Sequence, residues 1–163
     1  MLFYIGLFAM SDYSGLSLRD IKYTYPDTGT DRGNFSLYVD TLDIPAGRVT
    51  VFEGENGSGK TTLLKILARL LAADSGTIQA EGSRGAGELR VLVHQKPYLL
   101  RGTVFRNVAY GPKLMKLTGK VIDTKVRDSL ELVGLEGFER RKARALSGGE
   151  KQRVAIARTI LKR

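Results

Sequence analysis

The first fifty residues alternate hydrophobic and polar positions in a way that predicts antiparallel strands. Apolar residues recur at every second position over 16–25, and the phase of this alternation shifts near Asp20. A period of two is typical of a strand with one buried face, and the phase shift predicts a change of register. Turn-forming residues fill 26–34, a second alternating segment begins at 35–39, and residues 45–47 form a turn. We therefore expect an antiparallel meander at the start of the domain.

The pattern changes after residue 48. Residues 49–52 form a short apolar, β-branched run, which is typical of a strand buried on both faces. A glycine-rich loop covers 54–59, and apolar residues then follow helical spacing over 60–72. The predicted order is strand, glycine loop, helix.

The second half of the chain is mainly helical in pattern. Short strands are expected at 77–78 and 89–93, the latter ending at His94 and Gln95. Apolar residues at helical spacing predict three helices: 104–109, ending near Gly111 and Pro112; 121–133, with Gly134 as C-cap; and a segment after Ser147 that continues through Leu161.

Composition and charge narrow the choice of function only in part. The chain has 163 residues, no cysteine and a formal net charge of +9. The lack of cysteine excludes a disulfide scaffold and a thiolate metal site. The positive charge is compatible with nucleic acid, an anionic membrane surface or a phosphate ligand, and the basic run at 140–144 is either a solvated face or part of such a contact.

Residues 1–10 are almost wholly apolar. Ten residues are too few to span a bilayer as a helix, which needs about 20. The segment also lacks the basic start and the cleavage site of a signal peptide. It is either a dispensable apolar arm or a sign that translation begins at Met10. Since no other long apolar run occurs, we expect that the chain does not enter the membrane.

The glycine loop matches the phosphate-binding P-loop pattern of glycine, four residues, Gly-Lys and Ser or Thr. Glycines let backbone N–H groups turn toward a phosphate, and the following helix adds the positive end of its dipole. Lysine reaches the β- and γ-phosphates, and the threonine hydroxyl is a ligand for Mg²⁺. The predicted nucleotide-binding residues are Gly54, Asn56, Gly57, Ser58, Gly59, Lys60, Thr61 and Thr62, with Lys60 catalytic and Thr61 a metal ligand.

A second glycine cluster lies at residues 146–153, Leu-Ser-Gly-Gly-Glu-Lys-Gln-Arg. Ser147, Gly148 and Gly149 place a hydroxyl and free backbone N–H groups at a helix start, where anions bind readily. A plain serine N-cap accounts for the hydroxyl but not for two glycines in the first turn, where they weaken a helix. The segment closely resembles the signature sequence of ATP-binding cassette (ABC) ATPases. In that family the signature binds the γ-phosphate of the ATP on a partner subunit.

The resemblance to ABC ATPases extends over about residues 16–163 and assigns further residues. Tyr25 resembles the aromatic that stacks on adenine, although an ordinary strand aromatic is the alternative. Gln95 resembles the Q-loop glutamine, which gives it a catalytic and metal-binding role, and the stretch after Pro97 resembles the Q-loop exit of transporter ATPases. His94 does not match the family's switch histidine, which lies well downstream of the signature.

The resemblance implies an α/β fold: a P-loop NTPase core with a parallel sheet and flanking helices, an N-terminal antiparallel β-subdomain and a helical signature subdomain. We expect one partial ABC ATPase domain over 1–163. Within it, 1–15 is an unstructured apolar arm, 16–95 the β-subdomain and P-loop core, and 96–163 the Q-loop exit and signature subdomain. The family's next elements, a strand ending in a metal-binding Asp (the Walker B motif), a catalytic Glu and the switch His, would follow residue 163, so this chain alone is expected not to hydrolyse ATP.

The implied function is the ATP-binding subunit of an importer. Its cofactors would be ATP and Mg²⁺, and its partners would be membrane permease subunits and a second ATPase subunit in a head-to-tail dimer, without nucleic acid. It would work in the cytoplasm at the inner face of the membrane. Residues 111–145 resemble ATPases for oxyanions such as tungstate, molybdate or phosphate.

Alternatives to an importer subunit are other ABC-type ATPases and a non-functional remnant. The ABC ATPases of chromosome maintenance and DNA repair separate the P-loop from the signature by a very long coiled coil. Here Ser147 lies 87 positions after Lys60 (147 − 60), and no sustained heptads intervene. Translation-associated ABC proteins carry two cassettes in one chain. The sequence does not separate a working subunit from a remnant.

Overall fold

The computed structural model describes residues 15–26, 35–80, 91–94 and 96–161. Residues 1–14 of the predicted N-terminal arm and Gln95 lie outside these residues. The chain forms two compact units, residues 1–92 and residues 93–163, and each is described by itself. Among the described residues, no helix combines the length and the apolar character that crossing a membrane would require.

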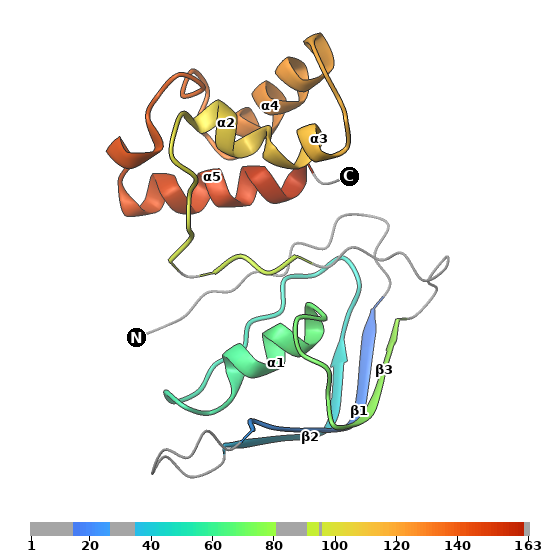
Figure 1. The fold of residues 1–163 in the computed structure, drawn as a ribbon. Helices are drawn as coiled ribbons and strands as arrows, with labels where there is room; N and C mark the ends of the chain where they lie inside the picture. The colour runs from blue at the N-terminus through green and yellow to red at the C-terminus, as the bar shows by residue number, and fades with distance from the viewer. Residues whose placement is uncertain (1–14, 27–34, 81–90, 95, 162–163) are drawn as a thin grey trace. The chain divides into compact units, whose positions relative to one another are not determined.

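The first unit is built on an antiparallel sheet. Strands β1 (Leu16–Thr24), β2 (Ser36–Ile44) and β3 (Ser75–Ala80) lie in the order β2-β1-β3 (Figure 1). The predicted register shift is confirmed, since Asp20 has a φ of 51° and the pairing of β1 with β3 is irregular between Arg19 and Lys22. The predicted strands at 16–25, 35–39 and 77–78 are therefore all present.

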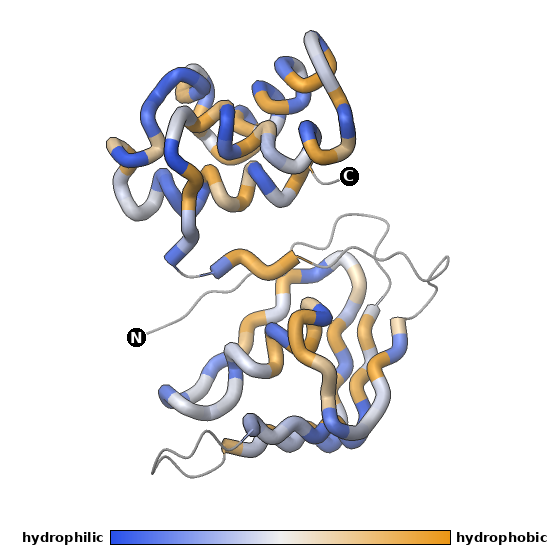
Figure 2. Tube along the Cα trace, viewed as in Figure 1, coloured by the Kyte–Doolittle hydropathy of each residue, from blue (hydrophilic) through white to orange (hydrophobic). Residues whose placement is uncertain are grey.

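One face of the sheet forms the core of the first unit. Leu18 and Ile21 of β1 are fully buried, together with Leu64 and Ile66 of helix α1 (Lys60–Leu67). Leu18 and Ile21 share the buried face although they are three residues apart, because the irregularity at Asp20 shifts the phase of β1. Helix α1 buries residues around much of its circumference: Thr62, Leu63, Leu64, Ile66 and Leu67. Figure 2 shows the resulting clusters of hydrophobic positions on α1 and on the strands.

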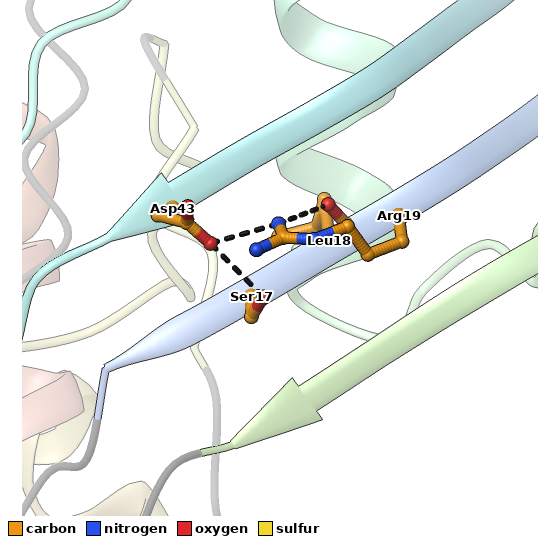
Figure 3. A network of polar contacts seen from close by, with 4 residues as sticks. All are labelled: Ser17, Leu18, Arg19 and Asp43. Carbon is orange, nitrogen blue, oxygen red and sulfur yellow. Dashed lines mark hydrogen bonds and ion pairs between the residues drawn. The ribbon is translucent and has the colours of Figure 1, made fainter.

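Polar contacts on the opposite face of the sheet link β1 to β2 (Figure 3). The Ser17 hydroxyl and the Arg19 guanidinium donate hydrogen bonds to Asp43 Oδ1 at 2.9 and 2.8 Å, and Arg19 also donates to the Leu18 carbonyl. The hydrogen bond from Arg19 lowers the pKa of the Asp43 carboxyl below its usual range. Since Ser17 lies directly opposite Asp43, these contacts support the observed register.

The strands predicted at 49–52 and 89–93 are not formed by the described residues. Residues 49–52 and 91–94 have no strand assignment, and Val49 and Val51 are 70% and 42% exposed. A parallel strand is stable only with hydrogen-bonded neighbours and covered faces, and no described segment pairs with either stretch. The sheet that the structure describes is therefore wholly antiparallel.

The second unit is helical. Its elements are α2 (Val104–Val108), α3 (Tyr110–Leu114), α4 (Lys120–Leu132), the 3₁₀ turn η1 (Ala143–Ala145) and α5 (Gly148–Ile160). Fully buried Val104, Val126, Leu130 and Val154 join α2, α4 and α5 in one core. The three predicted helices are confirmed, and Gly134 follows α4 with a left-handed φ of 66°.

The prediction that the first of these helices ends near Gly111 and Pro112 is wrong. Ala109 has helical geometry and joins α2 to α3, which contains both residues. Pro112 lies in the first turn of α3, where its missing N–H costs no hydrogen bond.

We predict that Gly76→Ala destabilises the first unit by about 2–4 kcal/mol. Gly76 has a φ of 95°, and an added Cβ would collide with the backbone carbonyl of Asp20 and lie 2.7 Å from the Arg19 oxygen. Gly47→Ala is the control, because Gly47 also has a positive φ but open space around it, so about 1 kcal/mol is expected. Urea unfolding measures both, and equal losses would contradict the steric account.

Candidate functional site

The glycine loop leads into the N-terminus of α1 and takes backbone conformations that only glycine adopts readily. Gly54, Gly57 and Gly59 have φ angles of 152°, 87° and 90°. Gly59 is also needed for space, because a Cβ there would lie 2.7 Å from Leu37 Cδ1 and 3.1 Å from Phe35 Cζ. As N-cap of α1, Gly59 offers no side-chain acceptor, so the first amides of the helix face an exposed loop.

The Lys60 ammonium group lies over this loop. Its Nζ donates hydrogen bonds to the carbonyl oxygens of Gly54 and Glu55, at 2.7 and 2.6 Å, and to Ser58 Oγ at 3.0 Å. A cation held at the centre of the loop, at a helix N-terminus, is the arrangement that attracts a phosphate. The structure places the Lys60 ammonium where the sequence predicts a phosphate ligand, and its role as that ligand stays a prediction.

Two threonines follow the lysine and differ in exposure. Thr61 is exposed, so its hydroxyl is available to a metal ion beside a phosphate. The Thr62 side chain is only 6% exposed, and its hydroxyl lies 3.4 Å from the Tyr25 hydroxyl. Thr62 can therefore contribute its backbone N–H to a ligand, while its side chain contacts the tyrosine. Asn56, also predicted here, is exposed in the loop.

Tyr25 lies in an aromatic cluster of the first unit. Its ring packs edge-on against Tyr23 at 5.0 Å between centroids and is tilted against Phe35 at 6.2 Å. It is partly exposed, and its hydroxyl points toward Thr62 near the start of α1. The structure thus brings the predicted adenine contact close to the P-loop helix.

The second glycine cluster opens α5 in the helical unit. Ser147 is the N-cap: its Oγ accepts a hydrogen bond from the Glu150 N–H at 3.3 Å, while Glu150 Oε2 accepts one from the Ser147 N–H at 2.7 Å. Ser147, Gly148 and Gly149 are all exposed. A Cβ on Gly148 would meet nothing within 4 Å among the described residues, so none of their packing requires glycine there.

Glu150 is a residue that our sequence reasoning missed. It completes the capping box with Ser147, and its Oε1 lies 3.8 Å from Arg141 Nη1. The hydrogen bonds from Ser147, with Arg141 and Arg153 nearby, lower the pKa of this carboxyl. The pattern Ser-x-x-Glu before a helix was the available signal.

The segment after Gln95 is fixed by Asn107, another residue that sequence reasoning missed. Asn107 is fully buried on α2 and accepts a hydrogen bond from the Leu100 N–H at 2.7 Å. Its amide donates to the carbonyl oxygens of Leu100 and Thr103 at 3.0 and 2.9 Å. A buried asparagine on a helix gives no sequence signal of its own. Gln95 itself lies outside the described residues, and His94 is exposed.

Comparison with known proteins shows to which family the chain belongs. The sequence pattern of the family described as "ABC transporter" matches residues 38–163. The chain belongs to the ABC transporter family. Within this family it is 41% identical over 152 residues to the spermidine/putrescine import ATP-binding protein PotA of Clostridioides difficile, covering 90% of the chain and 42% of that protein. It is 39% identical over 153 residues to a putative ABC transporter ATP-binding protein of Archaeoglobus fulgidus, covering 86% of the chain and 50% of that protein.

Solved structures support the same ABC ATPase fold. One is the cbiO1 protein of Clostridium perfringens, part of the ABC transporter complex cbiONQ. The match covers 93% of this chain and 62% of the cbiO1 chain, with a TM-score of 0.64 and 23% sequence identity. Another is a putative metal-chelate type ABC transporter in an inward-facing conformation. The match covers 91% of this chain and 57% of that chain, with a TM-score of 0.67 and 22% sequence identity. The predicted fold class is confirmed, and the chain spans about half the length of the curated relatives it matches.

We predict that the capping box makes this ABC domain sensitive to acid. The folded-state pKa of Glu150 is depressed, so its contribution to stability is complete above the ordinary glutamate range and is lost as the pH falls through the lowered pKa. Glu150→Gln should flatten the dependence of the thermal midpoint on pH between about pH 3 and pH 6. Glu136→Gln, at an exposed position outside α5, serves as control and should keep the slope. An unchanged slope in Glu150→Gln would refute the assignment.

Proposed function

We propose that this protein is the ATP-binding subunit of an ABC importer, with ATP and Mg²⁺ as its cofactors. The observation that carries the proposal is the position of Lys60 Nζ, held by two loop carbonyls and Ser58 at the N-terminus of α1. The match to the family and the 41% identity to one import ATP-binding protein, PotA, support it.

The loop has the properties that a triphosphate requires. Positive φ angles at Gly54, Gly57 and Gly59 shape an exposed turn of backbone, and the α1 dipole adds positive potential. The ammonium of Lys60 would exchange its present carbonyl partners for phosphate oxygens, which form stronger charge-assisted hydrogen bonds. Thr61 would hold Mg²⁺ through its exposed hydroxyl, together with phosphate oxygens, and Gln95 would contribute to the same ion and to water positioning. Tyr25 would contact the adenine.

The signature residues are proposed to bind the γ-phosphate of an ATP on a second subunit. Ser147 exposes its hydroxyl beside two glycines that cost helix stability, although none of the described residues fills the space beside Gly148. A surface kept free of side chains at a helix N-terminus fits the close approach of an anion from outside the unit. This arrangement supports a head-to-tail dimer, with each ATP between Lys60 of one subunit and Ser147 of the other.

Permease subunits would hold the protein at the cytoplasmic face of the membrane. We propose an oxyanion as the cargo, because residues 111–145 resemble ATPases for oxyanions. The alternative is a polyamine, because one relative is named for spermidine and putrescine import. Uptake of labelled molybdate and labelled spermidine, compared in cells with and without the gene, separates these cargos. Loss of molybdate uptake alone supports the oxyanion, and loss of spermidine uptake overturns it.

We predict that Lys60→Ala weakens ATP binding by about 10- to 100-fold, because one charge-assisted contact is worth roughly 1.5–3 kcal/mol. Isothermal titration of the chain with Mg-ATP measures this change. Lys65→Ala removes the same charge from the last turn of the same helix and should leave the affinity within about twofold. Equal affinities for the two variants would remove Lys60 from the phosphate site.

We predict that Ser147→Arg in a full-length subunit carrying this signature leaves ATP binding by the monomer intact and blocks ATP-dependent dimers. The P-loop is unchanged in this variant, while the arginine fills the space beside Gly148. Sedimentation with and without ATP, in a hydrolysis-deficient background, distinguishes these states. Thr124→Arg adds the same charge at an exposed position of α4 and should dimerise normally. Normal dimers with Arg at position 147 would refute the head-to-tail arrangement.

A further inference from the structure

Residues 110–121, which we call the basic–apolar tip, carry an unusual combination of side chains. Four large hydrophobic residues here are substantially exposed: Tyr110 at 49%, Leu114 at 68%, Met115 at 55% and Val121 at 53%. They are four of the ten exposed large hydrophobic residues in the described chain, within twelve positions. The tip also carries three exposed lysines, at 113, 116 and 120, and no acidic residue.

The backbone of the tip is held by its own hydrogen bonds. Met115 N–H donates to the Gly111 carbonyl at 3.2 Å, and the Leu117 N–H donates to the Pro112 carbonyl at 3.1 Å. Lys116 and Gly119 have φ angles of 60° and 59°, which turn the chain between α3 and α4. Figure 2 shows hydrophobic and hydrophilic positions alternating along this connection. The exposed side chains therefore stand on an ordered turn.

The four exposed hydrophobic side chains of the tip are not part of the core of the helical unit. Leu114 and Met115 are not members of that core, whereas Leu117 packs against it. Beside them, Lys113 and Lys116 line a pocket of about 600 Å³ together with Phe105, Leu117 and Ile122, and Asp123 is the single acidic lining residue. Lys113 Nζ lies 5.9 Å from the centre of the Phe105 ring. Cationic groups and apolar walls thus share one surface.

We propose that the basic–apolar tip binds the surface of an anionic lipid bilayer. Lysines at a bilayer surface are attracted by anionic headgroups, while leucine, methionine and tyrosine side chains partition into the boundary between headgroups and acyl chains. A nucleic acid backbone would use the lysines but not the exposed Leu114, Met115 and Val121 between them. The proposal goes beyond the permease-bound subunit described above, because the contact needs no permease.

The test is sedimentation of the whole 163-residue chain with lipid vesicles that contain no permease. Vesicles of phosphatidylcholine are compared with vesicles containing about 30% phosphatidylglycerol. Binding is expected to the anionic vesicles and to weaken as salt rises from about 0.1 to 0.5 M. The apolar residues 1–10 are present in every variant, so differences between variants report the tip.

Matched variants separate the tip from general charge and general hydrophobicity. Replacing Lys113, Lys116 and Lys120 with Gln should lower the partition coefficient roughly 100-fold, at about fivefold for each lysine. The same change at Arg140, Lys142 and Arg144 removes equal charge and should have a much smaller effect. Leu114→Gln should lower binding severalfold, whereas Leu132→Gln, at a side chain of similar exposure, should not.

Four results would overturn the proposal: no binding to anionic vesicles, equal binding to neutral vesicles, equal losses in the tip and control variants, or tighter binding to duplex DNA through the same three lysines. Circular dichroism of every variant confirms that these exposed substitutions leave the helices intact.

Discussion

The close approach between the end of the glycine loop and strand β2 is the constraint on which the candidate site depends. Leu37 comes so near to Gly59 that a single additional methyl group would collide with it, and Phe35 would be in tight contact with the same group. This contact fixes the first residue of α1 against the sheet, while the buried leucines of α1 fix its axis. Lys60 therefore starts from a defined position, and its ammonium reaches back over the loop to Gly54 and Glu55.

A comparable logic organises the helical unit, where polar groups hold the segments that carry predicted functions. Asn107 satisfies both backbone groups of Leu100 in a fully buried setting, so the stretch that follows the predicted Q-loop is tied to α2. Glu150 and Ser147 bind each other's backbone N–H and thereby set the start of α5. In both places a buried or reciprocal hydrogen bond positions a loop that would otherwise have many conformations.

Local patterns in the sequence were sufficient to predict the three strands that the structure describes, the approximate positions of the helices and the glycine loop before α1. The alternation around Asp20 predicted even the irregular pairing of β1 with β3, because a strand with one buried face cannot change phase without a bulge. The P-loop was predictable because its chemistry needs fixed residue types at fixed spacing. Ser147 was predictable as an N-cap for the same reason.

Other features depend on contacts between distant residues and left no local signal. Residues 49–52 read as a strand because of their composition, but a strand forms only where a neighbour supplies hydrogen bonds, and no described neighbour does so. The roles of Asn107 and of Leu37 against Gly59 arise from tertiary packing alone. The division into two compact units, residues 1–92 and 93–163, depends on such contacts as well.

The central claim is that the loop at residues 54–62 receives the phosphates of ATP. Amide hydrogen exchange of the chain, followed by mass spectrometry with and without Mg-ATP, tests it most directly, because the proposed ligands include backbone N–H groups of that loop. We predict slower exchange in peptides covering 54–62, with no change in peptides covering α4. Unchanged exchange at 54–62 under saturating Mg-ATP, or protection confined to other segments, would contradict the account.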